Sequence, residues 1–173
     1  MNPVRNSNSS LGNKIPSRVK IIIKNLHTKI PVPQARLKRA IREVLLSQKR
    51  YRRADITVCV VTDASIAKLN ARFLGKNAPT DVIAFDLSKK EVPPRLVADI
   101  VISADMACYN AGAFGTSALY EIYLYVVHGM LHLLGYDDVT AKQRARMQKK
   151  AEYFLRKIGI KPDSLCPSIK PKR

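Results

Sequence analysis

The sequence predicts an α/β fold, a single domain in which a mixed, largely parallel four-stranded sheet is packed with about five helices. Short β-branched runs alternate along the chain with segments in which apolar residues recur at helical spacing. The chain has 173 residues, which suits one domain with tails and is enough to bury a sizeable core. Strands interleaved with helices are typical of a sheet on which the helices pack.

The two ends of the chain differ in composition from the part between them. Residues 1–17 are rich in Asn and Ser and show no periodicity, so we expect a disordered tail. The C-terminal segment 161–173 is basic and contains prolines, and we expect it to be flexible. The predicted domain is therefore 18–160.

Two strands and two helices are predicted in the first half of this domain. The β-branched run 19–24 predicts a strand, and two prolines then precede a helix with one apolar face and a basic remainder. Residues 55–61 predict the second strand. Thr62 or Asp63 can cap the helix that follows, and Gly75 would end it. The apolar residues of this second helix are Ile66, Leu69, Phe73 and Leu74.

Two more strands and three helices are predicted in the second half. Residues 81–87 and 97–103 are strand-like and are separated by a polar, proline-containing loop. A short helix is expected over 104–111, followed by a long one over 117–134. The capping-box sequence 140–143 opens the last helix. The buried stripe of this last helix is expected to contain Met147, Ala151, Phe154 and Ile158.

The chain is strongly basic. Lysine and arginine number 31 against 13 acidic residues, which gives a formal net charge of +18. Such an excess favours a polyanionic partner bound through phosphate contacts, and RNA is the natural candidate. The alternative is a merely solvated surface, but like charges that repel one another this strongly destabilise the folded state. A polyanionic partner is therefore the better hypothesis.

Neither the apolar segments nor the cysteines indicate a membrane protein or a secreted one. We find no signal peptide and no run of about 18 uncharged apolar residues. The most apolar segment, 118–134, contains Glu121 and two histidines. The 3 cysteines are odd in number and widely spaced, which argues against a disulfide framework and for a reducing cytosol. We expect a soluble, cytoplasmic protein with no membrane partner.

Two histidines one helical turn apart are the clearest sign of a functional site. Residues i and i+4 lie on one helix face with Cβ atoms about 5–6 Å apart, so His128 and His132 can direct ring nitrogens at one ion. Gly135 is placed to take a left-handed conformation, which can turn Asp137 or Asp138 back over the rings. Three protein ligands leave a fourth position for water, as in catalytic zinc sites. The alternative is that both histidines are hydrogen-bonded packing residues.

The stretch 128–138 reads His-Gly-Met-Leu-His-Leu-Leu-Gly-Tyr-Asp-Asp. It resembles the signature of the YbeY family of bacterial single-strand endoribonucleases, His-Gly-x-Leu-His-Leu-x-Gly-Tyr-Asp-His, at every fixed position except the last. Matches upstream follow the family's order and extend the resemblance over roughly residues 20 to 158. These matches are Leu69-Asn70, Phe73, Gly75-Lys76, Pro79-Thr80-Asp81-Val82-Ile83-Ala84-Phe85 and Asp99-Ile100-Val101-Ile102-Ser103, the last preceded by Ala98 where the family has glycine.

The chain departs from the family pattern at two positions that bear on catalysis. The last ligand of the family, a histidine, is Asp138 here, and two histidines with one carboxylate bind zinc but also suit iron. The family's arginine in the upstream block is replaced by Leu74, which cannot hold a phosphate. Arg72 or Lys76 would then have to supply the positive charge. The resemblance also favours a catalytic, substrate-facing role for Asp81.

The resemblance implies a zinc-dependent endoribonuclease that cleaves single-stranded RNA, with His128, His132 and Asp138 as the metal ligands. It further implies a role in rRNA maturation, at the 3′ end of the small-subunit rRNA, and in ribosome quality control. The implied partners are single-stranded RNA, rRNA and the small ribosomal subunit, with ribosomal proteins or an assembly GTPase as further partners.

Two other functions are compatible with parts of the sequence. A metalloprotease would have a glutamate after the first histidine as general base, and Gly129 stands there instead, so peptide cleavage is a poor fit. The other is an RNA-binding ribosome-assembly factor with weakened catalysis and a structural metal. Leu74 favours this reading, and the retention of both histidines and Asp138 opposes it. Of these alternatives, we expect the protein to be the endoribonuclease.

Overall fold

The structure is a computed structural model that describes residues 18–162, apart from positions 28, 49, 52, 91 and 93. The predicted N-terminal tail lies outside the described residues, as does the C-terminal tail beyond Pro162. Within the described part of the chain, no helix is long and apolar enough to cross a membrane.

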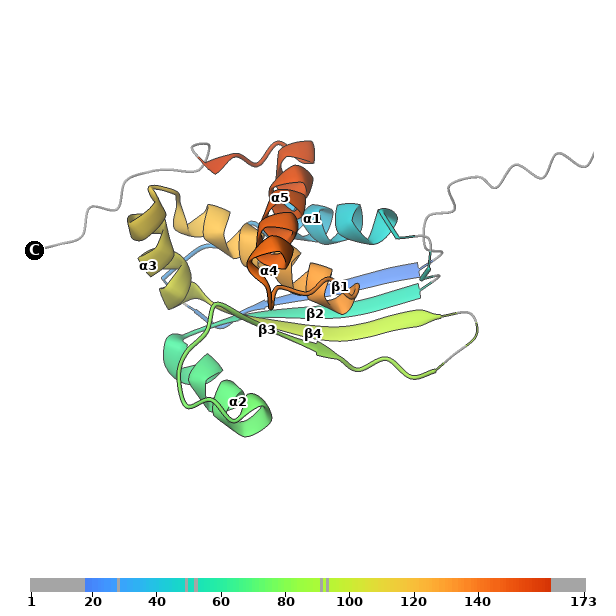
Figure 1. Ribbon diagram of the computed structural model, residues 1–173, viewed down its shortest axis with the longest axis horizontal. Helices are drawn as coiled ribbons and strands as arrows, with labels where there is room; N and C mark the ends of the chain where they lie inside the picture. Colours follow the sequence, from blue (N-terminus) through green and yellow to red (C-terminus); the bar gives the residue numbers. More distant parts are fainter. Residues whose placement is uncertain are drawn as a thin grey trace, which may run out of the picture.

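A single four-stranded sheet forms the centre of the fold (Figure 1). Its strands are β1 (Arg18–Asn25), β2 (Arg53–Val61), β3 (Val82–Asp86) and β4 (Arg95–Ser103), in the spatial order β1-β2-β4-β3. β1, β2 and β4 run parallel, and β3 pairs antiparallel with β4 at one edge. The predicted mixed, largely parallel sheet is therefore confirmed.

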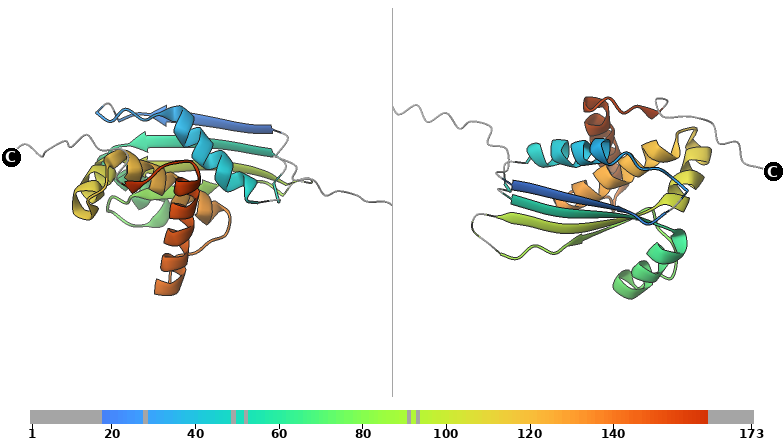
Figure 2. Two further views of the ribbon diagram at one scale, coloured as in Figure 1. Left: turned by 90° about the horizontal axis from the view of Figure 1, so that it is seen from above. Right: turned by 180° about the vertical axis from the view of Figure 1, so that it is seen from behind.

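Five helices surround this sheet, in the number that the sequence predicts. Figures 1 and 2 show α1, α4 and α5 on one face of the sheet and α2 on the other. The face with three helices carries the larger core, and α4 lies at its centre, in contact with the sheet, α1, α3 and α5. The helices are α1 (Gln34–Leu46), α2 (Asp63–Leu74), α3 (Ala104–Phe114), α4 (Ala118–Leu133) and α5 (Ala141–Lys157).

The helix starts follow the expected chemistry. The Thr62 side chain, rather than that of Asp63, caps α2 by accepting a hydrogen bond from the backbone N–H of Ser65. Thr140 and Gln143 form a reciprocal capping box at the start of α5. Each cap satisfies backbone donors that the helix itself leaves unpaired. α3 extends three residues beyond the expected 104–111, because Gly115 rather than Gly112 takes the left-handed conformation that ends it.

The second core, under α2, is small. It consists of four buried residues, and Ile66 is the one that α2 contributes to it. The apolar residues at the end of the helix do not join it, since Phe73 and Leu74 are each 55% exposed. Phe73 instead packs edge-on against Phe85, with ring centroids 5.1 Å apart. The apolar stripe of α2 is thus buried only where the helix lies over the sheet.

Gly129 sets how closely α4 approaches the sheet. A Cβ at this position would lie 3.1 Å from Cγ2 of both Ile100 and Val82, tighter than ordinary van der Waals contact. The helix backbone therefore rests almost directly on β3 and β4. Because residues i−1 and i+3 of a helix lie on neighbouring faces, this contact fixes the position of His128 and His132 relative to the sheet.

Candidate metal centre

The last two turns of α4 present His128 and His132 side by side. Their ring centroids are 4.8 Å apart and the ring planes meet at 80°. Both side chains are partly buried, with 21% and 34% of their surfaces exposed. The structure thus confirms that the i, i+4 spacing places the two imidazoles on one helix face.

Gly135 turns the chain back toward these rings. It has a φ of 85°, a left-handed conformation that glycine adopts without a steric penalty. Its N–H donates to the carbonyl of His132 at 2.8 Å, and the N–H of Tyr136 donates to the carbonyl of Leu131 at 3.0 Å. These two bonds form a Schellman motif, which ends a helix and reverses its direction.

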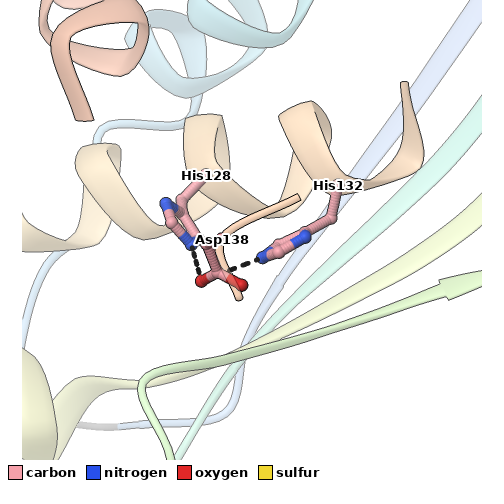
Figure 3. A group of neighbouring side chains, drawn as sticks. All are labelled: His128, His132 and Asp138. Atoms are coloured by element: carbon pink, nitrogen blue, oxygen red, sulfur yellow. Dashed lines mark ion pairs between the residues drawn. The ribbon is translucent and has the colours of Figure 1, made fainter. Parts of the chain in front are cut away.

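The reversed chain brings Asp138 against both histidines (Figure 3). Oδ2 of Asp138 lies 3.4 Å from Nε2 of His128 and 3.7 Å from Nε2 of His132. One potential ligand atom of each residue lies within 4.8 Å of the other two. Asp137 is engaged elsewhere, because its Oδ1 accepts the backbone N–H of Asp138 at 2.8 Å. A hydrogen bond from Arg144 to the Asp138 carbonyl, at 3.0 Å, ties this loop to α5.

Charges and burial around His128 favour its metal-binding form. Burial lowers the pKa of its imidazole, and neighbouring His132 lowers the pKa further, while Asp81 and Asp138 raise it. A neutral imidazole is the form that ligates metal. Two imidazole nitrogens and one carboxylate oxygen are the donor types that zinc and similar transition metals bind. The residues present therefore fit a divalent transition metal.

The remaining site residues predicted from the sequence divide into two groups. Asp81 precedes β3, where its Oδ1 accepts the backbone N–H of Val82 at 2.8 Å, and its charge acts on His128. Arg72 and Lys76 lie at the exposed end of α2 and just after it. In the described part of the chain, neither side chain forms a hydrogen bond or ion pair with the two histidines or Asp138.

An aromatic ring can bind an RNA base by stacking, and the tyrosines of α4 and of the loop after it differ in exposure. Tyr120, Tyr123 and Tyr125 of α4 are buried in the core, so they have no open ring face for RNA. Tyr136, in the loop that follows α4, is half-buried.

Glu121 is a buried carboxylate on the same helix. No functional role for it is predicted from the sequence. It is 3% exposed, and its Oε1 accepts a hydrogen bond from the Thr116 hydroxyl at 2.5 Å. Burial raises the pKa of this carboxyl, the Thr116 bond lowers it, and the charge of Asp81 raises it. Its signal in the sequence is a single acidic residue within an apolar helix.

We expect Glu121→Gln to stabilise the protein at neutral pH. A carboxyl whose pKa is raised by folding binds more protons in the native state, so stability falls as pH rises from its ordinary pKa of 4.5 through the folded value. Glutamine keeps an acceptor for Thr116 without the buried charge. Urea midpoints at several pH values should show a gain above the folded pKa that disappears in acid.

The matched control is Glu152→Gln on α5, where the carboxylate is partly exposed and pairs with Arg156. This variant should show no comparable pH-dependent gain. A Glu121→Gln variant less stable than the wild type at neutral pH would contradict the prediction, because it would mean that the folded protein needs the charge.

Comparisons with known proteins agree with the predicted family. The family model described as Endoribonuclease YbeY matches residues 22–159. Endoribonuclease YbeY of Pelotomaculum thermopropionicum is 34% identical over 148 residues, which cover 81% of this chain and 97% of that protein. Endoribonuclease YbeY of Bacillus subtilis is 36% identical over 118 residues, 62% of this chain and 74% of the relative.

A solved structure resembles the fold. The solution structure of a Thermotoga maritima protein aligns with a TM-score of 0.52 at 24% sequence identity, over 88% of this chain and 99% of that one. This likeness supports the α/β architecture, and the sequence matches carry the family assignment. The chain belongs to the YbeY family of endoribonucleases, hydrolases that act on RNA.

Proposed function

We propose that this protein is a zinc-dependent, single-strand-specific endoribonuclease of rRNA maturation, acting in the cytoplasm at the 3′ end of the small-subunit rRNA and in ribosome quality control. The observation that carries the proposal is the convergence of His128, His132 and Asp138 where the family signature ends. The small ribosomal subunit, with ribosomal proteins or an assembly GTPase, would be its cellular partner. The formal charge of +18 suits such a polyanionic partner.

The three converging side chains would hold the metal. A bound zinc ion would supply Lewis acidity and lower the pKa of water, the chemistry that hydrolysis of a phosphodiester needs. Asp81 would face the substrate from the start of β3, and Arg72 or Lys76 would neutralise phosphate charge. Iron is the other metal that a two-histidine, one-carboxylate set suits.

The protein should be tested as the full chain, purified without added metal. Metal analysis would identify the bound ion, and cleavage of single-stranded RNA would be compared with cleavage of duplex RNA. His132→Ala, purified in parallel, is the control for contaminating nucleases. We expect metal-dependent cleavage of single strands by the wild type alone. Equal cleavage by the wild type and His132→Ala, or no cleavage by a metal-loaded wild type, would refute the proposed endoribonuclease activity.

The assembly-factor alternative predicts that the metal-loaded wild type cleaves no RNA. Such a protein would bind metal and RNA without turnover. The metalloprotease alternative is opposed by the packing of Gly129. Its Cα faces β3 and β4, so a side chain there would point into the sheet and away from a substrate.

Leu74→Arg should increase RNA cleavage without changing the metal content. Leu74 is 55% exposed at the end of α2, so an arginine can be placed there without entering the core. If the position faces phosphate, a gain of about tenfold in kcat/KM is expected, since hydrogen bonds to charged groups contribute about 1.5–3 kcal/mol. Single-turnover cleavage rates would measure it.

Leu87→Arg is the matched control, because Leu87 is 52% exposed and gains the same charge at another place. A general charge effect would raise both rates equally. An unchanged rate in Leu74→Arg would show that this position does not face the phosphate.

A further inference from the structure

A hollow lies at the Leu134–Gly135 turn, next to the loop that carries Asp138, and none of the three candidate metal ligands lines it. Its volume is about 330 Å³, and its walls come from this turn, the end of α1 and the start of α5. The lining residues include Tyr136, Arg146, Gln48 and Gln143, of which Gln143 already accepts the backbone N–H of Thr140 through its Oε1. Asp137 also lines it, with its carboxylate held by the backbone N–H of Asp138.

Two cations approach the Tyr136 ring from α5. Nζ of Lys150 lies 4.9 Å from the ring centroid, and Cζ of Arg146 lies 5.9 Å from it. These two residues are one helical turn apart, where like charges repel and destabilise a helix. Within the described residues, neither forms an ion pair with a carboxylate. Their charges are thus gathered at one aromatic ring and are not paired with a carboxylate, although Asp137 lines the same hollow.

Such a surface suits one unit of a nucleic acid strand. Cations bind the phosphate, an aromatic ring packs against a base without regard to sequence, and amide side chains can bond to base edges. Tyr136 and Asp138 belong to the same short loop, so one RNA strand could contact the Tyr136 ring and continue toward the metal centre.

We propose that this hollow, together with Lys150 at the Tyr136 ring on its border, is a nucleotide subsite of the RNA strand, in which Arg146 and Lys150 hold a phosphate and Tyr136 packs against the adjoining base. The inference rests on the proposed function for its ligand, RNA. It adds a binding position outside the metal ligands, and its test is a binding measurement that needs no turnover.

Lys150 and its neighbour Lys149 offer a charge-matched comparison. Lys150→Gln removes the charge beside Tyr136 and keeps much of the side chain, while Lys149→Gln removes the same charge from an exposed position on α5. The probe is a short, labelled single-stranded oligouridylate, titrated with full-length protein at several salt concentrations. Thermal melting of each variant verifies folding.

We expect Lys150→Gln to weaken binding about tenfold and to make the salt dependence shallower by roughly one in slope. Lys149→Gln should change binding by less than about twofold, because charges farther than about 8 Å from the phosphate are largely screened. Equal weakening by both variants, or no binding by the wild type, would overturn the subsite.

Tyr136 tests the base contact independently. Tyr136→Phe should bind as the wild type does, and Tyr136→Leu should bind at least about fivefold more weakly, because stacking on an aromatic face is lost. Equal RNA affinities of Tyr136→Phe and Tyr136→Leu would show that the aromatic ring does not contribute to RNA binding. If the wild type binds RNA through Lys150 and Tyr136 but cleaves nothing, the subsite stands and the proposed function fails. If the wild type cleaves RNA while the Lys150→Gln and Lys149→Gln variants bind RNA equally well, the proposed function stands and the subsite fails.

Discussion

Asp138→Ala should lose most of the bound metal and, with it, most of the RNA cleavage. The carboxylate supplies the third of three converging ligand atoms, and its Oδ2 lies within 3.7 Å of both histidine nitrogens. Removing a residue that only hydrogen-bonds to a metal ligand typically lowers metal affinity about 10–100-fold. Removing a ligand itself should lower metal affinity by at least as much. Metal content after dialysis against a weak chelator measures the loss directly.

Asp137→Ala is the matched control, because it removes a neighbouring carboxylate that caps the backbone N–H of Asp138. It should retain more metal than Asp138→Ala. Asp138→His should also retain metal, since imidazole is a zinc ligand. Full metal occupancy in Asp138→Ala would exclude Asp138 as a ligand, whatever happened to cleavage.

Gly129→Glu should leave the protein largely unfolded. Its Cβ would meet Ile100 and Val82 at 3.1 Å, and the carboxylate would be buried between α4 and the sheet without a partner. Overpacking typically costs about 1–3 kcal/mol and an unpaired buried charge several more, against a total stability of about 5–15 kcal/mol. Circular dichroism and a urea titration would show the loss.

Gly129→Ala separates the two causes. Alanine adds the Cβ without a charge, and its helix propensity offsets about 1 kcal/mol of the crowding cost. We expect a folded protein with a modest loss of stability. A stable Gly129→Glu variant would mean that α4 can move away from β3 and β4, and the close approach would then be unimportant.

The sequence predicts most of the fold because its periodic segments are long and consistent with one another. The apolar α4 and the β-branched strands need no tertiary information to be recognised. The end of α2 is different: Phe73 and Leu74 have the spacing of a buried stripe, but this turn meets only the edge strand β3, through Phe85, and both side chains stay 55% exposed. Sequence alone does not locate the edge of a sheet.

The candidate site shows the same division. The pair of histidines follows from helix geometry, and the spacing of the signature favours Asp138 over Asp137. The buried state of Glu121 and the gathering of Arg146 and Lys150 at Tyr136 depend on how helices pack. Those contacts join residues whose side-chain directions are set by tertiary structure, and no local pattern encodes them.

The order of the strands also bears on how the protein avoids self-association. An exposed strand edge is a template on which another chain can add a strand and begin to aggregate. One edge here is β1, whose exposed side carries Arg18, Lys20 and Lys24, with the partly exposed Ile22 between the two lysines. The opposite edge is β3, which is only five residues long and ends at Asp86. Short strands and charged side chains both discourage edge-to-edge pairing, so neither edge offers another copy of the chain a long, uncharged strand to pair with.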